Sequence, residues 1–290
     1  MRPVRDFVYC HQAARPRKVA CMMKRHTVLG LIAWAGLLLI CGICRAEQPS
    51  QAAVAGFNNY VGALEAQLAA QHQHSAGFIA LADPAAQTEA RLRRGELVIE
   101  NLTQAKSDLP GATIYHWRGT AFVPGATAAD FERLMRDFPG YPRIYSPQVI
   151  SARVLSRNRN RYQVAMRVKQ KHVITVVMDS NYDVEFAQLD ASHGWSISRS
   201  TRIDEIENGH VLSPADQHGF LWRLNTYWTF EQRDGGLYMQ IESVSLTRSI
   251  PIGLGWAVGP FVQSVPRESL EFTLRATRDA LRNIQKGEKQ

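Results

Sequence analysis

Residues 122–147 read FVPGATAADFERLMRDFPGYPRIYSP, and this stretch combines the end of a strand, a turn and a short helix. Pro124 and the glycine after it end the preceding apolar run, because these residues interrupt regular structure. Thr127 with Asp130 three residues later is the capping pattern of a helix start. The apolar residues that follow share one helical face: Phe131, Leu134, Met135 and Phe138. The stretch therefore predicts a strand followed by a short helical insertion.

The chain around this insertion is dominated by short segments rich in β-branched and aromatic residues. Turn residues such as Asn158, Gly209 and Gly235 separate them, a pattern typical of consecutive hairpins. Together with the strand that ends at Pro124 they make seven expected strands: 112–123, 149–157, 161–170, 172–186, 195–207, 220–232 and 236–250.

Two helical patterns flank the strands. Near the N-terminus, gaps of three and four place Val54, Phe57, Val61, Leu64 and Leu68 on one helical face, whereas 75–87 reads as a loop. At the C-terminus, a long helix is expected from about Ser264, with an apolar face formed by Leu270, Leu274, Thr277, Leu281 and Ile284. An antiparallel sheet must cover its apolar face, so we expect an α+β fold in which a strongly curved sheet wraps around this final helix.

This order of elements resembles the START-like superfamily, also called helix-grip or SRPBCC, which includes polyketide cyclases, coenzyme-Q-binding proteins and lipid-transfer domains. The stretch 122–147 looks like the family's first strand, helix and following turn. The resemblance implies a START-like domain over 95–290, preceded by an extra helical segment over 47–94. It also implies an apolar ligand cavity between the sheet and the terminal helix. The superfamily has no invariant catalytic motif, so the resemblance implies a fold more than a function.

The first 46 residues have the three parts of a signal peptide. Met23-Lys24-Arg25-His26 is a short basic start, and residues 28–43 form an uncharged apolar run. Small residues stand at Cys44 and Ala46, at the −3 and −1 positions of a cleavage after Ala46. We therefore expect residues 1–46 to be removed and the protein to be periplasmic or secreted. Since residues 1–22 precede a complete signal, we expect translation to begin at Met22 or Met23.

Charge and cysteine are both concentrated in this presequence. The chain has a formal net charge of +8, but residues 1–46 hold eight Lys/Arg and one Asp, which leaves 26 basic and 25 acidic residues after them. All four cysteines also precede residue 47. The body is therefore nearly neutral and free of thiols, so we expect no nucleic-acid partner, disulfide or thiolate metal site.

Catalytic and cofactor motifs are missing from the body. It has no phosphate-binding loop, dinucleotide fingerprint, His-Glu-x-x-His pair or Gly-x-Ser-x-Gly elbow, and its histidines are scattered. We therefore expect no cofactor and no metal site.

The informative signal is charge among aromatic residues on the expected strands. Alternation places Arg199 and Glu205 on one face of 195–207 with Trp195 and Ile197, and it places Glu242 and Arg248 together on 236–250. Inward-facing charges must pair with each other or with a ligand's head group, because an unpaired buried charge is costly. Trp222 and Trp228 would share an apolar face that lines a cavity. The expected ligand-binding residues are Arg199, Glu205, Trp222, Trp228, Glu242 and Arg248.

Three functions remain open on this sequence. The first is an exported binding protein for a hydrophobic small molecule or lipid, with transient contact to a membrane surface. The second is a cyclase or dehydratase that uses Glu205 or Glu242 as acid or base near Arg199 or Arg248. The third is a structural or interaction module whose interior is filled by side chains. Surface ion pairs would explain the four charged residues equally well.

Overall fold

The computed structural model describes residues 48–290 except 83, 104–107, 172–174, 250–254 and 288–290, and of 255–263 it describes the backbone alone. The expected signal peptide, 1–46, lies outside the described residues. Residues 46–290 form one compact unit with its own hydrophobic core.

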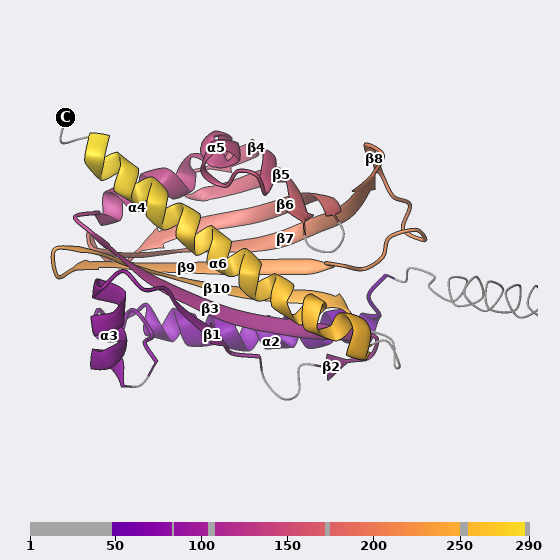
Figure 1. The fold of residues 1–290 in the computed structure, drawn as a ribbon, viewed down its shortest axis with the longest axis horizontal. Helices are drawn as coiled ribbons and strands as arrows, with labels where there is room; N and C mark the ends of the chain where they lie inside the picture. The colour runs from indigo at the N-terminus through magenta and orange to yellow at the C-terminus, as the bar shows by residue number, and fades with distance from the viewer. Residues whose placement is uncertain (1–47, 83, 104–107, 172–174, 250–254, 288–290) are drawn as a thin grey trace, which may run out of the picture. The chain divides into compact units, whose positions relative to one another are not determined.

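The seven expected strands are all present and form one antiparallel sheet (Figure 1). Their bounds are β3 (Ala112–Pro124), β4 (Val149–Asn158), β5 (Arg161–Lys171), β6 (Thr175–Gln188), β7 (His193–Glu207), β9 (Arg223–Arg233) and β10 (Gly236–Arg248). Three short strands join them: β1 (Val98–Asn101), β2 (Asp108–Leu109) and β8 (His210–Val211). The order is β1-β3-β10-β9-β7-β6-β5-β4, with β2 on β3 and β8 on β7, so β4 is an edge strand.

The helices agree with the sequence in part. The expected N-terminal helix is α2 (Gln51–Gln71), and α4 (Ala128–Arg136) begins with a capping box formed by Thr127 and Asp130, as predicted. After α4 the chain makes two short turns, η1 (Phe138–Gly140) and α5 (Tyr141–Ile144). The sequence missed α3 (Ala85–Arg93), which starts directly after Pro84 inside the expected loop. The terminal helix α6 (Gly255–Gly287) begins nine residues before Ser264.

The two faces of the sheet are covered by different helices (Figure 1). Leu270, Leu274 and Leu281 of α6 pack on one face, which we call the α6 face. Gly119 of β3 permits this close approach, since a Cβ there would lie 2.5 Å from Leu270 Cδ2. Phe57, Val61 and other apolar residues of α2 pack on the opposite face, the α2 face. The fold is α+β, with the curved antiparallel sheet and long C-terminal helix expected of a helix-grip arrangement.

A β-bulge in β7 changes which side chains face α6. Tyr182 of β6 is opposite Ser200, but the preceding Asn181 is opposite Arg202, so Thr201 is an extra residue. Beyond this point the alternation of β7 is reversed, because two residues of the bulged strand oppose one partner. Arg199 and Glu205 therefore lie on opposite faces, and the prediction that they share a face is wrong.

Candidate functional site

One half of the α6 face is a filled hydrophobic core. Phe131 of α4 packs on Trp228 and Phe230 of β9, with ring centroids 5.3 and 4.8 Å away. Leu274 and Leu281 of α6 are fully buried in the same cluster. We call this region the packed half. Its side chains fill the space between the sheet and the helices, so it is a structural core.

The other half of the α6 face carries small hydroxyl groups. In one row across four strands, Ser198 is opposite Thr226, Thr226 opposite Ser243, and Ser243 opposite Trp117. The adjacent row toward α4 is largely apolar and contains Ser196, Trp228, Ile241 and Gly119. We call the region that begins at the Ser198 row the hydroxyl half; it also includes Ser200, Ser245, Thr247 and Gln170.

Three buried polar atoms of the hydroxyl half have no hydrogen-bond partner in the part of the chain that the structure describes. They are Trp117 Nε1, Thr247 Oγ1 and Gln170 Oε1. By strand register all three side chains belong to the α6 face. A buried polar group without a partner costs about 1–3 kcal/mol, so three of them on one face call for an explanation beyond folding. They belong to three different strands, β3, β5 and β10, so they offer separate hydrogen-bonding positions to a ligand over this half.

The expected charged residues do not form a site together. Arg199 lies on the α2 face and makes two hydrogen bonds to Glu65 of α2, at 2.7 and 2.6 Å. Tyr227 donates to the same carboxylate at 3.1 Å. Arg199 therefore attaches α2 to the sheet, and its expected association with Glu205 is wrong.

Glu242 also lies on the α2 face, in a buried polar cluster. His116 Nε2 is 2.7 Å from one carboxylate oxygen, and Arg118 donates twice to the other. Tyr60 of α2 bonds to His116 Nδ1 at 2.9 Å. Burial acts to raise the pKa of Glu242, but the His116 hydrogen bond and the Arg118 charge outweigh it, so the pKa is lowered. This carboxylate is held ionised by protein groups on the face opposite α6.

Glu205 is on the α6 face by register, opposite Met178, but its oxygens are occupied. It accepts hydrogen bonds from the backbone N–H groups of His218 and Phe220, and from His218 Nδ1 at 2.8 Å. Glu205 thus fixes the loop between β8 and β9. With Arg199 and Glu242 on the other face, the expected combination of carboxylate and arginine that a cyclase would use is not assembled.

Trp228 lies apart from Trp222 and Arg248, whereas Arg248 shares the α2 face with Glu242, as predicted. Trp228 lies in the packed half, whereas Trp222 belongs to the cluster under α2, so their expected shared face is wrong. The cause is that β9 begins at Arg223, and strand alternation does not extend to Trp222. Arg248 ends β10 on the α2 side by register, where its backbone N–H donates to Gly219.

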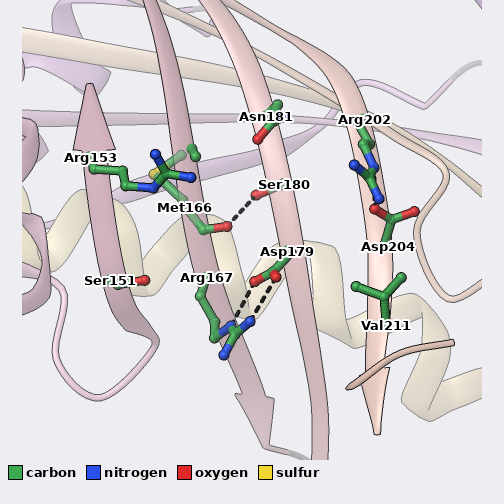
Figure 2. A pocket seen from close by; sticks show the side chains of 11 residues that line it. Ser151, Arg153, Met166, Arg167, Asp179, Ser180, Asn181, Arg202, Asp204 and Val211 are labelled. Carbon is green, nitrogen blue, oxygen red and sulfur yellow. Dashed lines mark hydrogen bonds and ion pairs between the residues drawn. The ribbon is translucent and has the colours of Figure 1, made fainter. Parts of the chain in front are cut away.

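A polar pocket of about 320 Å³ lies on the sheet face opposite α6 (Figure 2). Arg167 and Asp179 form two hydrogen bonds of 2.7 Å across it, and Arg202 pairs with Asp204. These charges satisfy one another. A second pocket of about 220 Å³ lies between α2 and the sheet, beside Trp195 and His72. Burial lowers the pKa of His72 to about 4, so His72 is neutral there at pH 7.

The described residues include no group of three or more side chains suited to a metal ion. Nor does any helix in the described part of the chain combine the length and apolarity needed to cross a membrane.

Comparisons with known proteins give similarities at low sequence identity. No protein-family model and no curated protein sequence matches the chain. A protein from Thermus thermophilus has 18% identity and a TM-score of 0.44 over 58% of this chain and 97% of its own. A STAR-related lipid transfer protein from Xanthomonas axonopodis has 18% identity and a TM-score of 0.40, over 63% and 98%. The Zhui aromatase/cyclase from a Streptomyces species has 12% identity and a TM-score of 0.40, over 58% and 94%. The topology described above, rather than these similarities, defines the fold.

Proposed function

We propose that the protein binds a hydrophobic small molecule or lipid between the hydroxyl half of the α6 face and helix α6. The observation that carries this proposal is the set of three buried polar atoms, at Trp117, Gln170 and Thr247, that have no partner among the described residues and share a face with a row of serine and threonine. These groups carry no charge. They suit a mainly apolar ligand that carries a few uncharged polar groups.

The expected energetics favour such a ligand. Each methylene buried against apolar surface contributes about 0.8 kcal/mol, so an alkyl chain or ring system supplies the affinity. Each hydrogen bond that completes a buried donor or acceptor adds about 1 kcal/mol and fixes orientation. Binding of this kind needs no catalytic residue.

Native mass spectrometry of the purified protein, followed by incubation with a panel of lipids, tests the proposal. We expect either a retained ligand or uptake of at least one lipid. Trp117→Phe removes the indole N–H and should weaken binding about five- to tenfold, the equivalent of one hydrogen bond. Trp222→Phe is the matched control, since Trp222 is buried on the α2 face.

Two results would contradict the proposal. One is the absence of any bound or acquired ligand, which would favour a module with a filled interior. The other is an equal loss of binding in Trp117→Phe and Trp222→Phe, which would mean that the hydroxyl half has no special role.

We also propose that the protein acts outside the cytoplasm. This proposal is supported by the basic, apolar and small-residue pattern of residues 23–46. Cell fractionation with N-terminal sequencing of the mature protein tests it, and the expected first residue is Glu47. Recovery of the protein in the cytoplasmic fraction would contradict it, whereas an exported protein that keeps residues 28–43 would contradict only the cleavage.

A further inference from the structure

The β4–β5 hairpin concentrates positive charge in a nearly neutral body. Residues 149–171 contain seven Arg/Lys and no Asp or Glu. The rest of 47–290 holds 19 basic and 25 acidic residues. The hairpin thus carries +7 and the remainder −6, although the total is +1. Such an asymmetric distribution directs an anionic partner to one place on the surface.

Most of this charge is available to a partner. Arg161 pairs with Glu185, and Arg167 pairs with Asp179. The ion pairs formed among the described residues involve none of the other five: Arg153, Arg157, Arg159, Lys169 and Lys171. Of these, the Arg157 guanidinium lies 5.2 Å from the ring centroid of Tyr162, which orders it without neutralising it.

The edge strand β4 adds apolar groups to the same region. Its pairing with β5 has two register shifts, one between Val149 and Ser151 and one between Val154 and Ser156. The extra residues are Ile150 and Leu155, which are 47% and 43% exposed. With Val154, three of the six exposed large hydrophobic residues in the described part of the chain belong to β4.

The bulges limit what can cover this edge. A β-bulge interrupts the row of backbone hydrogen-bonding groups and so opposes the addition of another strand. A second copy of the chain would also bring its own +7 hairpin against the first. The remaining partner must be anionic and must accept apolar side chains. An anionic lipid surface has both properties, whereas nucleic acid would match the charges but leave Ile150 and Leu155 without a contact.

We propose that the β4–β5 hairpin docks on an anionic lipid bilayer, with Ile150 and Leu155 in the interfacial region and the five cations named above on the head groups. The proposal goes beyond ligand binding and does not depend on it. It places the bilayer at the edge of the sheet formed by β4.

Vesicle flotation with residues 47–290, which form a compact unit, tests the proposal. The vesicles are phosphatidylcholine alone or mixed with phosphatidylglycerol, at low and high salt. We expect binding to the anionic vesicles only, and a loss of binding at high salt because exposed charges are screened. Each basic residue near such a surface contributes about fivefold in affinity. The triple variant Arg153→Gln/Arg159→Gln/Lys169→Gln should therefore bind about two orders of magnitude more weakly.

The second variant, Ile150→Ser/Leu155→Ser, should bind about tenfold more weakly with its charge unchanged. Matched controls outside the hairpin are Arg91→Gln/Arg94→Gln/Arg267→Gln for charge and Leu189→Ser/Phe220→Ser for exposed apolar residues. Circular dichroism verifies that each variant is folded. Equal binding to neutral vesicles, equal losses in the controls, or binding to DNA without binding to vesicles would each overturn the proposal.

Discussion

The two faces of the sheet treat buried polar groups in opposite ways. On the α2 face, buried charges are paired within the protein: Glu242 with His116 and Arg118, and Arg199 with Glu65. On the α6 face, the groups without a partner among the described residues are neutral, among them Trp117 Nε1 and Thr247 Oγ1. A charge that is not paired on folding would cost several kcal/mol, whereas an unpaired hydroxyl costs about 1–3 kcal/mol. The neutral groups are therefore the ones that the fold can leave for a ligand.

The largest expected effect lies on the α2 face. Glu242→Ala leaves His116 and Arg118 buried without their carboxylate, and we expect it to lower the free energy of unfolding by about 3–5 kcal/mol. Urea denaturation followed by circular dichroism measures this. The variant Glu242→Gln provides the second measurement. If it lost ligand binding but kept its stability, Glu242 would be a binding residue, and the contrast between the two faces would be wrong.

The next largest effect is a pH dependence of the unfolding free energy, caused by His72 on the α2 face. His72 is buried with Nε2 3.0 Å from Thr229 Oγ1, and burial lowers its pKa from 6.5 to about 4. As the pH falls, the His72 imidazole is therefore protonated in the unfolded chain before it is protonated in the folded protein. The stability due to neutral His72 is complete above pH 6.5 and is lost as the pH falls toward 4, by about 2 kcal/mol after allowance for partial solvent access.

His72→Gln keeps a donor to Thr229 but does not titrate in this range. Its unfolding free energy should stay flat between about pH 6.5 and about pH 4.5 in urea titrations. Below about pH 4.5 both proteins should lose stability, since the pKa of Glu242 is lowered by its partners and its contribution disappears as it is protonated. An identical pH profile for the two proteins at higher pH would mean that His72 is not the group responsible.

The fold was predictable because its signals are local. Alternation and turn residues placed the seven long strands, and Thr127 with Asp130 placed the start of α4. The face on which each side chain lies was harder to predict. Both faces of the sheet carry apolar residues, because α2 covers one and α6 the other. The alternation along a strand therefore does not show which residues face α6. The bulge at Thr201, which separates Arg199 from Glu205, depends on pairing with β6 and leaves no sequence signature.

The hydroxyl half did have a signal in the sequence. Serine or threonine recurs at every second position at Ser198 and Ser200, and again at Ser243, Ser245 and Thr247. These positions alternate with Arg199, Glu242 and Arg248, the charged residues predicted to bind a ligand. Charged residues are more conspicuous in a sequence than hydroxyl groups. On this sheet, however, Arg199 attaches α2 through Glu65, and Glu242 forms a buried ion pair with Arg118.

A pair of matched threonines sharpens the contrast between the faces. Thr229 and Thr247 are both buried, at 3% and 7% exposure, but Thr229 bonds to His72, whereas Thr247 Oγ1 has no partner among the described residues. Thr229→Val should lower the unfolding free energy by about 1–2 kcal/mol, because His72 loses its partner. Thr247→Val removes an unsatisfied hydroxyl at nearly constant shape, so stability should be unchanged or rise by up to about 1 kcal/mol. Thermal and urea unfolding measure both, and equal losses would contradict the assignment.

The smallest expected effect concerns the residue next to Glu242 in the chain. Ser243 points to the α6 face, half-buried between Thr226 and Trp117 in the hydroxyl row. Ser243→Ala should change the unfolding free energy by less than about 0.5 kcal/mol, in contrast to the several kcal/mol expected for its neighbour. Ligand retention measured by native mass spectrometry should nevertheless fall, because a hydroxyl at this position is available to the ligand rather than to the protein. A stability loss as large as that of Glu242→Ala would show that both faces use their polar groups to hold the fold together.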